Sequence, residues 1–187
     1  LGHRKGDGAD TARIELVDEA QMDALIKYAK LDYPVQPALF FEFHGTERGV
    51  QEQAEMVAAL GEEFGIGGFR WSKKPEERSK LWEARHNVLY SCLALRPGAK
   101  AWATDACVPI SRLAECIEET QEDIKSHGLL APIVGHVGDG NFHTTVLLDP
   151  ENPEELKNCH DFVERLALRA IALGREELVQ ALRRAEI

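Results

Sequence analysis

Two histidines, His136 and His143, flank a short turn and are the residues in this chain best suited to chemistry. The turn reads Gly138-Asp139-Gly140-Asn141, and apolar, β-prone runs precede and follow it at 131–134 and 144–148. This pattern predicts a strand, a tight turn and a second strand, so both imidazoles would lie at one end of a sheet. Such a pair can bind a divalent metal, polarise a substrate oxygen or transfer a proton.

The spacing of the two histidines leaves two interpretations open. Six residues separate His136 from His143, which is not one of the common helical zinc patterns. In the alternative the hairpin is purely structural: the glycines supply turn conformations and the histidines make local hydrogen bonds.

Arg85 is a second candidate, because it lies beside the apolar stripe of a predicted helix. A guanidinium held there against a pocket would bind a carboxylate in bidentate fashion. The alternative is a surface arginine paired with Glu77 or Glu83. Asp105 lies among small residues in a predicted strand, and its pattern indicates no more than a polar strand-end residue.

The composition favours a soluble, acidic domain. The 187 residues are 44% hydrophobic and 29% charged, with a net charge of −10. No basic cluster exceeds a pair of residues, which argues against nucleic acid and anionic membranes as partners. No apolar run approaches the roughly 20 residues of a membrane span. The four cysteines are scattered without a CxxC motif, so we expect free, buried thiols and a reducing compartment.

Hydrophobic periodicity predicts alternating strands and helices. Residues 152–155, Asn-Pro-Glu-Glu, predict the start of the last helix, with Asn152 as its N-cap. Strands are expected at 13–17, 37–44, 69–71, 100–109, 131–134 and 144–148, and helices at 19–30, 46–63, 75–95, 111–127 and from 153. The predicted fold class is α+β: an antiparallel or mixed sheet with helices packed mainly on one face and repeated β-α-β, ferredoxin-like units. The other face would be open to a partner.

Three motifs in this order resemble one protein family. They are Leu81-Trp82-x-x-Arg85, the run from Asp105 to Leu113, and the His136–His143 segment. The chain resembles the C-terminal, substrate-side domain of FAD-linked oxidases of the vanillyl-alcohol oxidase type, most closely the D-lactate dehydrogenases of the mitochondrial, cytochrome-linked kind.

The resemblance implies a mechanism for a FAD-dependent D-2-hydroxyacid dehydrogenase. His136 and His143 would hold a divalent metal, Zn²⁺ or Mn²⁺, that binds the substrate hydroxyl and carboxylate and lowers the pKa of the hydroxyl. Both histidines would thus be catalytic as well as metal ligands, while hydride moves from the substrate to the flavin. Arg85 and Asn141 would bind the substrate, and Asn141 and Asp139 would lie near the FAD.

The sequence also departs from the family pattern. No counterpart of the FAD-binding half is present, and after Gly174 no stretch matches the one that supplies the family's third, carboxylate ligand. We therefore expect the isolated chain to be inactive. Ala103 stands where the hydroxyglutarate enzymes carry a substrate-binding lysine, which favours a small substrate such as D-lactate.

These patterns divide the chain into a linker or truncated end at 1–10, the FAD-linked oxidase C-terminal domain at 11–174, and an atypical helical tail at 175–187. The expected partners are a FAD-binding domain, an electron acceptor protein and a second copy of the chain. The expected location is the cytoplasm, or the mitochondrial matrix and inner-membrane face. The alternative function is a non-catalytic fragment or engineered scaffold that uses an exposed sheet face for association.

Overall fold

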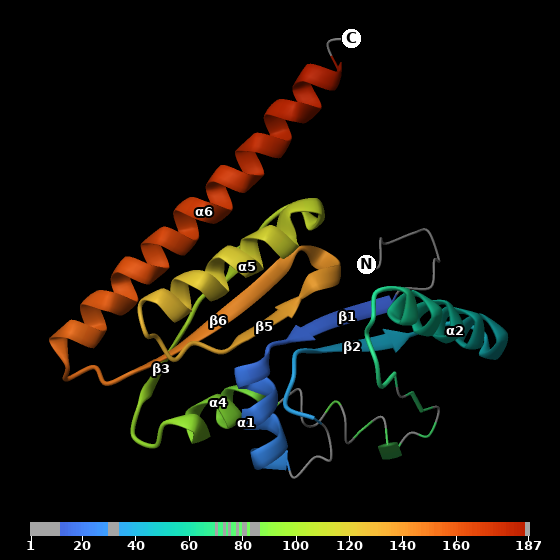
Figure 1. Ribbon diagram of the computed structural model, residues 1–187, viewed down its shortest axis with the longest axis horizontal. Helices are drawn as coiled ribbons and strands as arrows, with labels where there is room; N and C mark the ends of the chain where they lie inside the picture. The colour runs from blue at the N-terminus through green and yellow to red at the C-terminus, as the bar shows by residue number, and fades with distance from the viewer. Residues whose placement is uncertain are drawn as a thin grey trace.

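The computed structural model describes residues 12–29, 34–69 and 87–185, together with isolated positions between 71 and 82 (Figure 1). The strands are β1 (Ala12–Val17), β2 (Ala38–Phe43), β3 (Lys100–Ala103), β4 (Ala106–Cys107), β5 (Ile133–His136) and β6 (Asn141–Leu148). The helices are α1 (Glu19–Ala29), α2 (Glu47–Glu63), α4 (Val88–Leu95), α5 (Ile110–Ser126) and α6 (Pro153–Ala185), and a 3-10 turn, η1 (Val137–Asp139), joins β5 to β6.

The six strands form one sheet in the order β2-β1-β5-β6-β3, and β4 also pairs with β6. Every pair of neighbouring strands is antiparallel. The predicted α+β class is confirmed, and of the two predicted arrangements the sheet adopts the antiparallel one.

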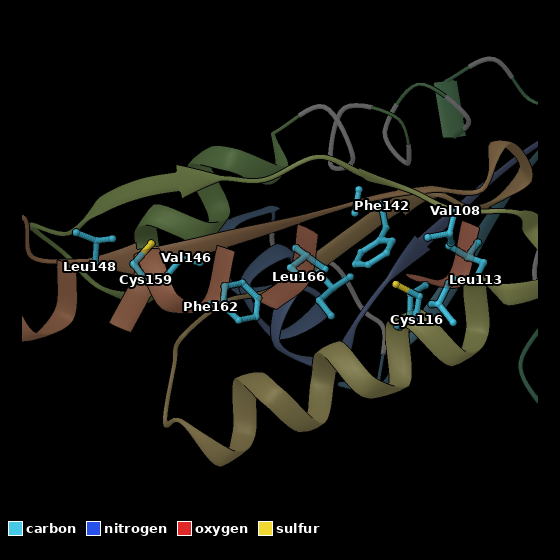
Figure 2. Packing of buried hydrophobic residues seen from close by; sticks show 14 residues of the cluster. Val108, Leu113, Cys116, Phe142, Val146, Leu148, Cys159, Phe162 and Leu166 are labelled. Atoms are coloured by element: carbon cyan, nitrogen blue, oxygen red, sulfur yellow. The ribbon is translucent and has the colours of Figure 1, made fainter. Parts of the chain in front are cut away.

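Two hydrophobic clusters lie on opposite faces of the sheet. The larger packs the inward faces of α5 and α6 against β5 and β6 around Phe142, Phe162 and Ile133, which are fully buried (Figure 2). The smaller packs α1 and α4 on the other face, around Val17, Leu25 and Cys92 among others. Helices therefore cover parts of both faces, whereas the sequence predicted helices mainly on one face and an open face opposite. Since side chains alternate along a strand, Val134 of the smaller cluster shares its face with His143, its partner in the register. The helix-covered part of this face therefore continues into the end of the sheet that carries the histidines.

Helix α6 begins where the sequence predicts, because Asn152 caps it. The Asn152 side-chain oxygen accepts hydrogen bonds from the backbone N–H groups of Glu154 and Glu155 at 3.1 and 3.4 Å. The Asn152 side-chain amide donates to the Glu155 carboxylate at 3.1 Å, and this carboxylate also accepts a hydrogen bond from Arg96 at 2.6 Å. These bonds hold the start of α6 to the end of α4. The helix continues to Ala185, so residues 175–185 are helical, while the division of the chain into segments remains a prediction.

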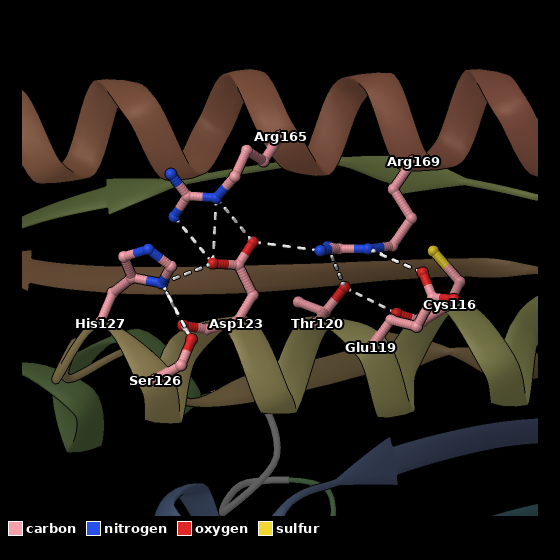
Figure 3. Close-up of polar contacts among 8 residues, drawn as sticks. All are labelled: Cys116, Glu119, Thr120, Asp123, Ser126, His127, Arg165 and Arg169. Carbon is pink, nitrogen blue, oxygen red and sulfur yellow. Dashed lines mark hydrogen bonds and ion pairs between the residues drawn. The ribbon is translucent and has the colours of Figure 1, made fainter.

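A cluster of charged side chains joins α5 to α6 (Figure 3). The carboxylate of Asp123 is almost fully buried and accepts hydrogen bonds from Arg165 at 2.7 to 3.1 Å and from Arg169 at 3.1 Å. The Nδ1 atom of His127 lies 3.0 Å from the same carboxylate. The groove between the two helices is lined by these residues. Asp123 pairs with Arg165 and Arg169 across it, so the cluster serves to dock α6 on α5.

Four sequence predictions need correction. Phe69 and Trp71 have no strand conformation. Residues with high β-propensity form a strand only where a neighbouring strand pairs with them. The predicted strand at 100–109 is two strands, interrupted at 104–105. Three cysteines are buried as expected, but Cys107 is exposed. In the helix predicted at 46–63, apolar residues recur at helical spacing from Val50 to Phe64, but only Ala54 among them is buried, and Leu60 and Phe64 are exposed. Of the helix predicted at 75–95, the structure describes one continuous helix, α4, at its C-terminal end. None of the described helices is long and apolar enough to cross a membrane.

Asp18 caps α1 and ties it to the sheet. Its two carboxylate oxygens accept the backbone N–H groups of Gln21 and Ile133, each at 2.8 Å. Burial raises the pKa of this carboxyl from 3.8 to about 6, against the opposing effect of the two hydrogen bonds.

We expect Asp18 to make the free energy of unfolding fall as the pH rises from about 4 to about 6, by on the order of 3 kcal/mol. A raised pKa means that the folded state binds the proton more tightly than the unfolded chain, so ionisation within this window favours unfolding. Urea unfolding of the parent chain and of Asp18→Asn across this range tests it. The Asn variant should gain stability relative to the parent as the pH rises, and parallel curves would contradict the prediction.

Candidate functional site

The hairpin of β5 and β6 positions the two histidines. His136 ends β5 and pairs with Asn141, the first residue of β6. The connection is the single turn η1 followed by Gly140, whose φ of +73° is in the left-handed region. The predicted hairpin is therefore present, with a four-residue connection at 137–140. Glycine is required at the last of these positions because other residues rarely adopt this conformation.

The register brings His136 and His143 together on one face of the sheet. Val134 pairs with His143 and His136 pairs with Asn141, so the two histidines are diagonal neighbours two positions apart. Their ring centroids lie 5.6 Å apart with the planes at 87°. The side chain of His143 is 30% exposed. The imidazoles are thus adjacent and reachable from solvent at the hairpin end of the sheet.

The orientation of His143 is set by the strand beside it. Its Nδ1 atom lies 3.1 Å from the carbonyl oxygen of Thr104. A carbonyl oxygen only accepts hydrogen bonds, so Nδ1 carries the proton in this arrangement and, in the neutral ring, Nε2 presents a lone pair. A histidine that ligates a metal commonly donates its other N–H in this way.

Asn141 is held in one orientation by acceptors on the neighbouring strand. Its Nδ2 atom donates to Asp105 Oδ1 at 2.5 Å and to the carbonyl oxygen of Ala106 at 3.3 Å. Both partners are acceptors, so the amide nitrogen must face them and the amide oxygen is directed away. Asp105 Oδ1 is also 3.6 Å from His143 Nδ1. The site therefore contains Asp105 and Thr104, two residues that the sequence patterns did not single out as functional; the only signal for Asp105 was its place in a motif of the resemblance.

Of the other predicted site residues, the structure describes Asp139 but not Arg85. Asp139 lies in η1 and is exposed. Arg85 lies outside the described residues. Cys107 is exposed and pairs with Asn141 in the register, so it shares the face of the histidines. Within the described ranges, no group of three or more His, Cys, Asp or Glu side chains is arranged to hold a metal ion. Within these ranges, His136 and His143 form a pair without a third ligating side chain.

A sequence profile described as "FAD linked oxidases, C-terminal domain" matches residues 3–174. The chain belongs to this family of FAD-linked oxidase C-terminal domains. The resemblance that the three motifs indicated is confirmed, and the hairpin described above is the hairpin of this domain.

Several curated relatives of this FAD-linked oxidase domain are D-lactate dehydrogenases. A probable mitochondrial D-lactate dehydrogenase of Danio rerio is 46% identical over 89% of this chain and 33% of its own length. The mitochondrial D-lactate dehydrogenase [cytochrome] of Arabidopsis thaliana is 36% identical over 81% of the chain and 27% of its own length. A glycolate oxidase subunit of Bacillus subtilis is 26% identical over 87% of the chain and 35% of its own length. The chain thus spans about a third of the length of these relatives.

A solved structure supports the fold. The 4-ethylphenol oxidase of Gulosibacter chungangensis, in complex with isoeugenol, aligns with a TM-score of 0.55 over 82% of this chain and 36% of the oxidase, at 14% identity. At this identity the likeness establishes the architecture of the domain and no more.

Proposed function

We propose that this chain is the substrate-side domain of a FAD-dependent D-2-hydroxyacid dehydrogenase that oxidises D-lactate to pyruvate. The observation that carries the proposal is the adjacent pair His136 and His143, with the Nδ1 proton of His143 donated to Thr104 and the Nε2 lone pair available. The identity of 46% to a probable D-lactate dehydrogenase supports the substrate class. Ala103, on β3 beside this site, leaves no lysine there for a second carboxylate, which favours a small substrate.

The residues of the hairpin would bind a divalent cation together with the substrate. Two imidazoles fit two positions of the ligand set of Zn²⁺ or Mn²⁺. When bound, such a cation lowers the pKa of a coordinated hydroxyl and so prepares it for oxidation. The amide oxygen of Asn141, turned away from Asp105, would accept a hydrogen bond from the substrate or the flavin. Arg85 would clamp the substrate carboxylate, and Asp139 would lie near the edge of the FAD.

The proposal assigns the remaining parts of the reaction to other components. FAD would be held by a flavin domain seated over the hairpin end of the sheet, and an electron acceptor protein would reoxidise it. The chain by itself would then be inactive. The mitochondrial relatives support a mitochondrial location. A non-catalytic scaffold that dimerises through an exposed sheet face is the second candidate, favoured by the exposed apolar residues Leu39 of β2 and Trp102 of β3.

Calorimetric titration of the metal-free chain with Zn²⁺ and with Mn²⁺ tests the metal site. We expect binding by the parent chain and a loss of affinity of about a hundredfold or more in the double variant His136→Ala/His143→Ala, because no described cluster replaces the two donors. His127→Ala is the matched control, since His127 lies at the end of α5, on the other face of the sheet. Binding that is equally strong in the double variant would contradict the site.

The substrate is tested in the protein that carries the flavin domain. Anaerobic addition of D-lactate should bleach the flavin absorbance, and D-2-hydroxyglutarate should do so far more slowly. Equal rates for the two acids would contradict the assignment to a small 2-hydroxyacid. An unbleached flavin with either acid would favour the scaffold.

A further inference from the structure

The break between β3 and β4 lies opposite His143 and has an unusual cause. The register on the two sides of the break is the same: Ala103 pairs with Thr145, and Ala106 pairs with Phe142. No residue is therefore inserted or missing. Thr104 and Asp105 stand opposite Thr144 and His143, yet the strand is interrupted there.

The side chain of Thr104 replaces its own backbone carbonyl in the ladder. The backbone N–H of Thr104 still donates to the Thr144 carbonyl at 2.9 Å. In the return direction, the N–H of Thr144 donates to Thr104 Oγ1 at 3.0 Å, and the two threonine hydroxyls lie 2.7 Å apart. The carbonyl of Thr104 is thereby released from the ladder and accepts the hydrogen bond from His143 Nδ1. The interruption thus turns a backbone acceptor toward an imidazole.

Asp105 uses the same interruption to reach two side chains of β6. Its Oδ1 atom accepts from the Asn141 amide at 2.5 Å and is 3.6 Å from His143 Nδ1. The Asp105 side chain is itself 73% exposed. An exposed carboxylate contributes little to the stability of a fold. Its two contacts are both with residues of the candidate site, so its effect should be on their orientation.

We infer that Asp105 is a positioning residue, which holds the Asn141 amide in one orientation and lies beside the Nδ1 atom of His143, at 3.6 Å, where the released Thr104 carbonyl already orients the ring. The Asn141 amide oxygen and the His143 Nε2 atom are then both directed away from the break, on the face that carries His136. The contacts of Asp105, Asn141 and His143 are observed in the structure. That they orient groups which bind substrate or metal rests on the proposed function.

The side-chain amide signal of Asn141 in a ¹⁵N-labelled NMR spectrum of the 187-residue chain tests the inference. In the parent chain we expect this signal to be displaced from its free position and its protons to exchange slowly with water. Asp105→Ala should return the signal to the free position. Asp105→Asn should keep it displaced, because the asparagine oxygen can still accept the hydrogen bond. Glu118→Gln, an exposed carboxylate change on α5, should have no effect.

Zn²⁺ affinity and thermal unfolding separate the possible explanations. Asp105→Ala should weaken Zn²⁺ binding by about tenfold or more, as expected for a residue that orients metal ligands, and should leave the unfolding midpoint unchanged. An unchanged Asn141 signal in Asp105→Ala, or equal loss of that signal in Asp105→Ala and Asp105→Asn, would overturn the inference. If the parent chain binds no Zn²⁺, the metal proposal fails while the Asn141 signal still decides whether Asp105 positions it.

Discussion

Replacing Gly140 with alanine is expected to lower the free energy of unfolding by about 3 kcal/mol or more. Gly140 has a φ of +73°, and a Cβ atom built on it would lie 2.2 Å from the carbonyl oxygen of Val108. The obstacle is backbone, and it belongs to the strand that pairs with the hairpin, since the N–H of Val108 donates to the Gly140 carbonyl at 2.9 Å. The clash must therefore separate the hairpin from the segment around β4, which also carries Asp105.

Gly128→Ala is the matched control for this variant. Gly128 also has a positive φ, of +61°, but no atom lies within 4 Å of its added Cβ. Its replacement should show the backbone strain alone, about 1 kcal/mol. Urea unfolding of both variants measures the difference, and the Gly140 variant should also lose the Asn141 amide signal. Equal destabilisation of the two variants would contradict the role assigned to the contact with Val108.

Replacing Asp123 with alanine is expected to destabilise the fold by about 3 kcal/mol. The side chain of Asp123 is 6% exposed and faces the guanidinium groups of Arg165 and Arg169. Burial alone would raise the pKa of Asp123, but the hydrogen bonds from the two arginines outweigh it and hold the pKa below its ordinary value. Its loss would leave Arg165 and Arg169 of α6 without the buried anion that they share, while Arg169 would keep its exposed partner Glu119.

Two further variants test this explanation. Glu119→Ala removes an exposed partner of Arg169 and should cost less than about 1 kcal/mol. Asp123→Ala combined with Arg165→Met and Arg169→Met should regain much of the lost stability, because it removes the unpaired charges as well. Unfolding in guanidinium chloride compares the three. A loss in Asp123→Ala no larger than in Glu119→Ala would show that the cluster does not hold α6 in place.

Acid should weaken the same cluster. A lowered pKa means that the ionised carboxylate is favoured in the folded state, so the stability that Asp123 contributes is present above its unfolded pKa and is lost as the pH falls through its folded value. Asp18 acts in the opposite direction, since burial raises its pKa to about 6.

The sequence alone determined the elements with strong local signals. Asn152 and the two glutamates after it predicted the start of α6, and apolar periodicity predicted the extent of α5, because capping and amphipathic patterns depend on residues within one or two turns. The hairpin, and with it the proximity of His136 and His143, followed from a turn only a few residues long. The family followed from the order of its motifs.

Only the tertiary structure decided how distant segments meet. β1 lies beside β5, more than a hundred residues along the chain, and no local pattern specifies that pairing. Asp105 meets Asn141 across 36 residues, and Arg165 meets Asp123 across 42. The strand break at Thr104 arises because its hydroxyl, in this register alone, stands opposite the backbone N–H of Thr144. Such contacts depend on sheet order and register, which are set by the packing of the whole core, and residue type and spacing do not contain that information.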